Sequence, residues 1–192
     1  MIPVDKVKKP RGFDAKVKVP GNAWLADHPK SQRPPALWAP HTAALSEGFD
    51  NLCGYAAMFD PTGGTVDLFL SFKHHPALAY EWSNYRFASG PLNSSKRNAD
   101  DAVLDPFEVG AGWFEIILPS LQMRLTDAVP VALREKAAFT MKRLKLRDGE
   151  RVIRWRQSWY RTYTNGQLTL EGLRVVAPLL AAAVDSQAQV VL

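Results

Sequence analysis

Two side chains with hard oxygen ligands, Asp67 and Asn93, flank a stretch in which short apolar runs alternate with polar loops. Asp67 lies in the run Thr-Val-Asp-Leu, and Asn93 begins Asn-Ser-Ser-Lys, which ends at Lys96. Carboxylate and amide oxygens are ligands that Mg²⁺ prefers in proteins. We therefore predict that Asp67 and Asn93 hold Mg²⁺ or Mn²⁺ weakly, because two protein ligands leave most coordination positions to water and phosphate.

More polar residues lie between these two ligands. Asn84 follows Trp82 and Ser83 and precedes a short apolar run, so its amide could bridge loop backbone. His74 and His75 stand in the preceding loop. An unperturbed imidazole titrates near neutral pH, as a general base requires.

Together these residues resemble the core of the HNH nuclease family, the ββα-metal fold. That family places Asp-His at the end of its first strand, an Asn before its second strand, and a His or Asn at the opening of its helix. Asp67, Asn84 and Asn93 match those positions, and Lys96 matches a lysine that often follows. The resemblance is densest over residues 52–109.

Three short motifs make the resemblance closest to one bacterial branch of the family. They are Tyr-Glu-Trp-Ser-Asn at 80–84, Asn-Ser-Ser-Lys at 93–96 and Asp-Pro-Phe at 105–107. That branch includes the HNH partner of Septu-type antiphage systems. The resemblance therefore implies a role in bacterial antiphage defence, with a partner protein such as a defence ATPase.

The resemblance also implies hydrolysis of a nucleic-acid phosphodiester with one metal ion. The metal grips the scissile phosphate and stabilises the leaving oxygen, and a histidine takes the proton of the attacking water. In this chain Asp67 and Asn93 would be the metal pair, and Asn84 would orient the base through its backbone. Lys96 would steady the phosphate or the loop.

Leu68 departs from this pattern, because it stands where the family has its general-base histidine. A leucine cannot accept a proton, and loss of a general base costs about 10²–10⁴-fold in rate. His74 and His75 are the candidate substitute bases. Three interpretations stay open: an HNH endonuclease or its catalytically impaired form, a non-enzymatic HNH-derived module that binds nucleic acid or protein, and an unrelated α+β interaction protein.

The composition fits one domain with a polyanionic partner. The chain has 192 residues, 46% of them hydrophobic, and a net charge of +5 with a pI near 9.4. Cys53 is the only cysteine, which excludes an internal disulfide and a zinc knuckle. No signal peptide is recognisable, and the longest apolar run, Val175–Val184, is far shorter than the roughly 20 residues of a membrane span. We therefore expect a cytoplasmic protein with no membrane partner.

A group of basic residues in the second half of the chain predicts contact with phosphates, although a solvated charged face is equally compatible with it. Its members are Lys142, Arg143, Lys145, Arg147, Arg151 and Arg154. Nucleic acid is the expected partner, with DNA favoured over RNA. An apolar face within Leu173–Leu192 either packs on the protein's own core or forms a homodimer interface.

The elements that position these residues are short. Proline residues in the segment 1–21 predict an extended basic arm without a helix. We then expect a helical turn or two at Asn22–His28 and a helix over Thr42–Leu52 that Thr42 caps. The glycine-rich turn at 61–64 predicts a β-hairpin of Gly54–Asp60 with Gly64–Leu70.

The candidate site continues with an extended segment, Asn84–Ser89, and a helix over Asn93–Asp101 that Asn93 or Ser94 opens. A second hairpin is expected to pair Trp113–Leu118 with Leu121–Leu125. The remaining predicted helices are Val131–Leu144, a helix from an Asp148 cap to about Tyr163, and Leu168–Ala183, bent or started at Pro178. The predicted fold is thus α+β, a single domain over residues 1–192. A ββα-metal (HNH-like) core at 52–109 is wrapped by N- and C-terminal helices, and residues 110–192 form the hairpin and helical C-terminal region.

Overall fold

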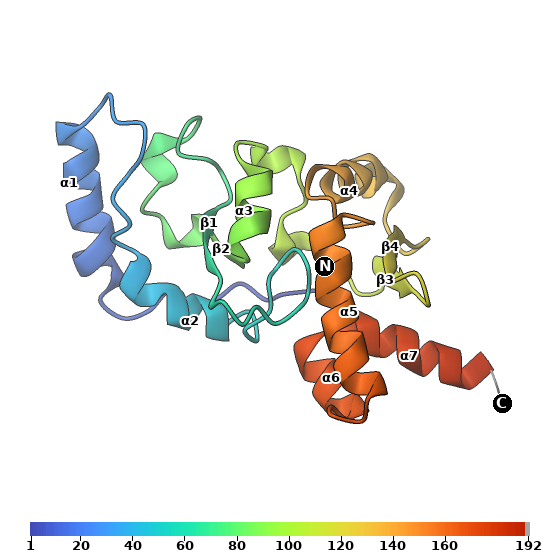
Figure 1. Cartoon of the computed structure of the whole chain (residues 1–192). Helices are drawn as coiled ribbons and strands as arrows, with labels where there is room; N and C mark the ends of the chain where they lie inside the picture. Colours follow the sequence, from blue (N-terminus) through green and yellow to red (C-terminus); the bar gives the residue numbers. More distant parts are fainter. Residues whose placement is uncertain (191–192) are drawn as a thin grey trace.

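The computed structural model of the chain describes the backbone of residues 1–190 and the side chains of residues 1–188. Helices surround two small antiparallel sheets, and Figure 1 shows one sheet beside α3 and the other beside α4. The first sheet pairs β1, Thr65–Leu68, with β2, Tyr85–Ala88. The second pairs β3, Phe114–Ile117, with β4, Gln122–Leu125. The α+β class predicted from the sequence is confirmed.

The N-terminal segment corrects the prediction of an extended arm without a helix. Residues 1–10 have no regular secondary structure, but a π-helical turn at Asp14–Lys18 leads directly into α1, Val19–Asp27. Pro20 lies in the first turn of α1, where its fixed φ of about −65° fits the helical backbone. Phe13 and Val17 are fully buried, so their burial ties the helix to the core.

The first predicted hairpin is wrong in its choice of strands. The strand β1 pairs with β2 in the register Asp67 to Arg86, while the segment 54–60 provides only an isolated bridge between Leu52 and Phe59. Ala57 has a φ of 52°, which an extended strand does not allow. Gly64 has a φ of 59° and its Cα lies against the Phe87 ring, where a Cβ would approach within 2.4 Å. The glycine turn thus lets the chain pass close to Phe87, so that β1 lies beside β2.

Helix α3, Gly90–Lys96, follows β2 directly and contacts β1. The predicted helix Asn93–Asp101 therefore begins three residues too late and ends too far along the chain. Pro91 explains the earlier start, because proline favours the first turn of a helix. Asn93 consequently lies inside the helix instead of capping it. Its side chain is free for a contact with the strands.

Helix α2, Thr42–Glu47, is shorter than predicted, and no side chain caps it. In the C-terminal half the second predicted hairpin is confirmed as β3 and β4. The helices there are α4 Val131–Arg143, α5 Glu150–Thr164, α6 Leu170–Val176 and α7 Pro178–Val190. Asp148 does not cap α5, because Gly149 is the N-cap and no side chain accepts from the first turn. Pro178 begins α7, as the sequence predicted.

Two clusters of buried apolar residues lie on either side of β1, β2 and α3. One joins Phe13, Leu45, Val66 and Phe87 on the N-terminal side. The other joins the C-terminal helices to β3 and β4, and Leu180 of α7 is buried in it. Most of the predicted apolar tail thus packs on the protein's own core, and residues 191 and 192 lie outside the described part. None of the described helices combines the length and apolar character that a membrane span requires.

Candidate functional site

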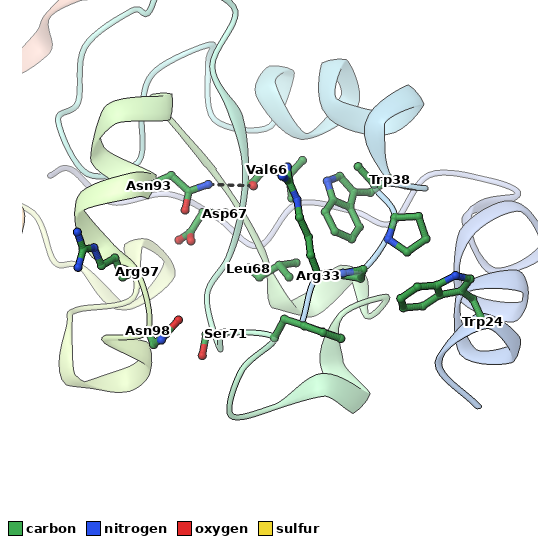
Figure 2. A pocket seen from close by; sticks show the side chains of 14 residues that line it. Trp24, Arg33, Trp38, Val66, Asp67, Leu68, Ser71, Asn93, Arg97 and Asn98 are labelled. Atoms are coloured by element: carbon green, nitrogen blue, oxygen red, sulfur yellow. Dashed lines mark hydrogen bonds between the residues drawn. The ribbon is translucent and has the colours of Figure 1, made fainter. Parts of the chain in front are cut away.

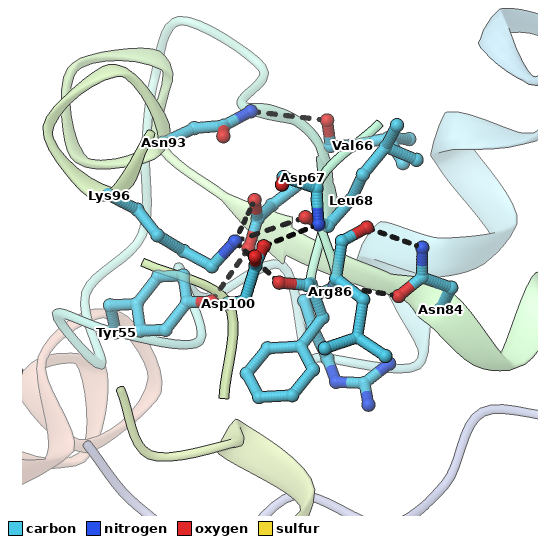
Figure 3. A network of polar contacts seen from close by, with 12 residues as sticks. Tyr55, Val66, Asp67, Leu68, Asn84, Arg86, Asn93, Lys96 and Asp100 are labelled. Atoms are coloured by element: carbon cyan, nitrogen blue, oxygen red, sulfur yellow. Dashed lines mark hydrogen bonds and ion pairs between the residues drawn. The ribbon is translucent and has the colours of Figure 1, made fainter. Parts of the chain in front are cut away.

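The carboxylate of Asp67 is buried and already has two hydrogen-bond donors. Asp67 is 1% exposed, its Oδ1 accepts from Lys96 Nζ at 3.0 Å, and its Oδ2 accepts from the Tyr55 hydroxyl at 2.6 Å (Figure 3). The pKa of Tyr55 is raised well above its usual value by burial and by the charge and hydrogen bond of Asp67. Tyr55 therefore keeps its proton and remains a donor.

Lys96 is fully buried and uses its whole ammonium group inside the protein. Besides Asp67, its Nζ donates to the carbonyl oxygens of Leu68 at 3.0 Å and Phe69 at 2.8 Å. Its place in the last turn of α3 lets one side chain reach the end of β1. Lys96 therefore holds α3 against the chain that follows β1. Of its two predicted roles, steadying the phosphate or steadying the loop, these contacts fit the second.

Asn84 fixes the chain just beyond Leu68. Its Oδ1 accepts from the Leu70 amide at 2.8 Å, and its Nδ2 donates to the Leu70 carbonyl at 3.0 Å (Figure 3). Its Nδ2 also donates to the Leu78 carbonyl at 3.1 Å. The Phe69 amide also donates to the Asn84 carbonyl at 2.9 Å. Asn84 is 5% exposed, so these bonds replace water entirely. The residue shapes the loop through contacts of its amide with the backbone, and no base stands at Leu68 for it to orient.

Asn93 and Leu68 lie with Asp67 along one open cleft of about 810 Å³ (Figure 2). Asn93 Nδ2 donates to the Val66 carbonyl at 3.2 Å. No donor among the described residues reaches its Oδ1 within hydrogen-bonding distance, so that oxygen is open to a ligand. The structure therefore brings Asp67 and Leu68 of β1 together with Asn93 of α3.

His74 is held by a carboxylate next to this cleft. Its Nδ1 lies 2.5 Å from Asp100 Oδ2, and Asp100 Oδ1 accepts from the Ser71 amide at 2.6 Å. Burial opposes ionisation of Asp100, but the hydrogen bonds from His74 and Ser71 outweigh it and lower the pKa of Asp100. With Nδ1 protonated toward the carboxylate, Nε2 becomes the proton acceptor. His75 is exposed, and within the described residues its side chain makes no hydrogen bond.

The oxygens of Asp67 and Asn93 fit a divalent cation in their chemistry, but Lys96 competes for the same carboxylate. A metal at Asp67 has to draw Oδ1 away from an ammonium that is already bonded to it. Within residues 1–188 no group of three or more His, Cys, Asp and Glu side chains is arranged for a metal. The predicted Mg²⁺ or Mn²⁺ would thus depend on one carboxylate, one amide oxygen and water, which is a weak donor set.

Sequence reasoning missed the buried pair of Arg86 and Asp105. Arg86 Nε and Nη2 donate to the two carboxylate oxygens of Asp105, each at 2.5 Å, and the guanidinium lies 3.9 Å from the centre of the Phe107 ring. Arg86 Nη1 also donates to the carbonyls of Ser83 and Tyr85. A charged residue in the apolar run Tyr-Arg-Phe is the sequence signal that would have predicted a buried partner.

The predicted basic cluster is divided among several roles. Lys142, Lys145 and Arg147 border a groove of about 630 Å³ between α4 and the second hairpin. Arg143 Nη2 instead donates to the Lys96 carbonyl at 3.1 Å and so caps the end of α3. Arg151 is exposed, and Arg154 pairs with Glu150 one helical turn before it. Of the cluster, mainly the three residues of the groove and Arg151 are therefore available for contact with phosphates.

A further arginine, Arg156 of α5, is buried without a carboxylate partner among the described residues. Its guanidinium donates to the carbonyls of Leu121 at 2.8 Å, Leu146 at 2.7 Å and Arg147 at 3.2 Å. Burial lowers the pKa of Arg156 to about 10, so it stays charged at neutral pH. The residue joins α5 to the turn between β3 and β4 and to the turn after α4.

Comparisons of this chain with protein-family models, with curated proteins and with solved structures found no match.

Proposed function

We propose that this chain is an HNH-type nucleic-acid-binding protein whose phosphodiesterase activity is impaired. The order β1, β2, α3 supports this, with Asp67 in the first strand, Asn84 directly before the second, and Asn93 in the helix. Asp67 and Asn84 occupy positions like those of the ββα-metal pattern, whereas Asn93 lies one turn inside the helix instead of at its opening. The ion pair between Asp67 and Lys96, directly beside Leu68, is the observation that carries the proposal.

This ion pair and Leu68 together account for the impairment. A leucine lines the cleft where a proton acceptor is needed, so the attacking water has no base beside Asp67. Lys96 neutralises the carboxylate that would hold the cation. A cation bound by Asp67 and Asn93 would polarise a phosphate, but these residues supply no proton transfer. The scaffold then serves binding better than cleavage.

The experiment combines a binding assay with a cleavage assay on the same preparation. We expect plasmid DNA and single-stranded DNA and RNA to bind with a strong salt dependence. Incubation with Mg²⁺ or Mn²⁺ should give no more cleavage than an Asp67→Asn variant. Efficient cleavage that this variant lacks would contradict the impairment. Absence of any nucleic-acid binding would favour the protein-binding alternative.

A second candidate is an active nuclease with His74 as the base. The contact between His74 and Asp100 favours it, because a carboxylate on Nδ1 orients the ring and leaves Nε2 to accept a proton. In that case His74→Ala abolishes cleavage, and His75→Ala, the matched control on the same loop, leaves it intact. Cleavage that survives His74→Ala would eliminate this candidate.

The biological setting follows from the resemblance alone. It supports a role in bacterial antiphage defence in the cytoplasm, with a partner such as a defence ATPase. A homodimer is a further proposal, for which Val175 of α6 offers an apolar side chain that is 68% exposed. Co-purification with a neighbouring ATPase and light scattering of the purified chain test these two partners.

A further inference from the structure

The cleft beside Asp67 has two arginines on opposite walls. Arg97 follows α3 on the wall that carries Asn93 and Asn98, and Arg33 extends from the facing wall (Figure 2). The arginine ion pairs of the described residues involve other positions, so neither guanidinium is neutralised within that part of the chain. Because Lys96 neutralises Asp67, the cleft carries net positive charge and suits an anion.

The wall that carries Arg33 is also aromatic and rigid. Trp24 and Trp38 line it, and both are partly exposed (Figure 2). Trp38 packs against Tyr85 with ring centres 5.6 Å apart, and the Tyr80 hydroxyl donates to the Pro35 carbonyl at 3.0 Å. These contacts hold the Arg33-Pro34-Pro35 segment in place before any ligand arrives, which lowers the entropy cost of binding.

The floor of the cleft holds an unpartnered hydroxyl. Ser71 is 6% exposed and lines the cleft, and its Oγ has no hydrogen-bond partner among the described residues. Buried polar groups are normally satisfied, so an exception at a cleft floor points to a ligand or water that completes it. Charge, aromatic rings and this hydroxyl therefore indicate the same occupant, an anionic molecule with a flat apolar part and polar edges.

We infer that this cleft binds one unpaired nucleotide of a single-stranded nucleic acid. The base packs on the wall of Trp24 and Trp38, and the flanking phosphates lie between Arg33 and Arg97. The inference rests on the proposed nucleic-acid binding and adds that the bound nucleic acid is single-stranded. Aromatic side chains can stack only on a base that has left its neighbours, and the bases of a duplex are already stacked on each other. The cleft therefore selects single strands over duplex.

The test measures anisotropy of labelled single-stranded oligonucleotides and of a hairpin duplex, both as DNA and RNA. We expect the single strand to bind more tightly than the duplex. Trp24→Leu should weaken single-strand binding about tenfold, in line with the loss of one stacked base, while Trp24→Phe should retain most of it because a ring remains. The double variant Arg33→Gln with Arg97→Gln should reduce the salt slope by about 1.4, the value for two lost phosphate contacts on a single strand.

Arg161→Gln is the matched control for charge, because Arg161 is exposed on α5 and does not line the cleft. Thermal denaturation of every variant confirms that the fold is retained. Equal affinity for single strand and duplex, or unchanged binding in Trp24→Leu, would overturn the cleft inference and leave the proposed function standing. If the unaltered chain binds no polynucleotide, both fail together.

Discussion

The ammonium of Lys96 lies 3.0 Å from Oδ1 of Asp67, and both side chains are shut off from solvent. The same ammonium binds two carbonyls that follow the carboxylate in sequence, so three oxygens surround one positive charge. Lys96 thus occupies the carboxylate that a divalent cation would need. The ion pair that stabilises this site therefore lowers the affinity of Asp67 for a metal ion.

Replacing Lys96 by methionine tests this competition. We expect Lys96→Met to be less stable by about 3–5 kcal/mol, because the buried carboxylate loses its counter-charge. We also expect Mn²⁺ to raise the melting temperature of Lys96→Met more than that of the unaltered chain, because the cation can now neutralise Asp67. Thermal denaturation with and without Mn²⁺ measures both effects.

The control for this experiment is Lys96→Met combined with Asp67→Asn. It removes both charges, so it should recover part of the stability and lose the response to Mn²⁺. Calorimetric titration of Mn²⁺ gives the affinities directly. If the unaltered chain binds Mn²⁺ as tightly as Lys96→Met, then Lys96 does not compete for Asp67.

Local spacing was enough to predict that Asp67 and Asn93, from a strand and the helix that follows the next strand, lie near each other, although the predicted strand pairing was wrong. Asn84 lies in the turn before β2 and does not line the cleft. The burial of Lys96 could not be predicted, because a sequence shows charge but not the depth at which a side chain ends. The apolar run around Arg86 does signal a buried partner, but the sequence does not show that this partner is Asp105, which lies beyond α3.

The errors in the fold have a common physical cause. The segment 54–60 has the composition of a strand, but the positive φ of Ala57 breaks its extended backbone, and β1 pairs with β2 instead. The segment 14–21 contains a proline and two lysines, yet Phe13 and Val17 bury enough apolar surface to fix a helix there. In both places tertiary packing overrides the local pattern, and a single sequence does not reveal the packing partner.

The pKa of Asp100 predicts a pH-dependent contribution to stability. Its folded-state pKa lies below the ordinary value of 3.8, so the unfolded chain takes up the proton first as pH falls. The stabilisation is therefore complete above about pH 5 and is lost as the pH falls below 3.8 through the folded-state pKa. Urea denaturation of the unaltered chain and Asp100→Asn should differ most at pH 7 and converge in acid. A difference that stays constant between pH 7 and pH 3 would contradict this assignment.

The basic cluster predicts a second contact with phosphates. Lys145→Gln with Arg147→Gln should weaken nucleic-acid binding and lower the salt slope, because both residues border the groove beside α4. Arg151→Gln with Arg154→Gln should have a smaller effect, because Arg154 is already paired with Glu150. Anisotropy over a range of salt concentrations compares the two double variants. Unchanged slopes in both would show that phosphates do not reach this face.

Restoring a base at position 68 tests the HNH interpretation most directly. If only the base is missing, Asn84 already shapes the loop and Asn93 already presents its amide oxygen to the cleft. Leu68→His then places an imidazole beside Asp67, with an ordinary pKa near 6.5 that suits proton abstraction. We expect this variant to gain Mn²⁺-dependent nicking of plasmid DNA, by a factor of about 10² or more over the unaltered chain.

Two further variants make the result decisive. Leu68→Met changes the side chain without adding a base, so it should gain nothing. Leu68→His with Asp67→Ala should lose the gained activity, because the carboxylate at the end of β1 is removed. No nicking by Leu68→His, in a chain that folds and still binds nucleic acid, would mean that the scaffold is arranged for binding alone.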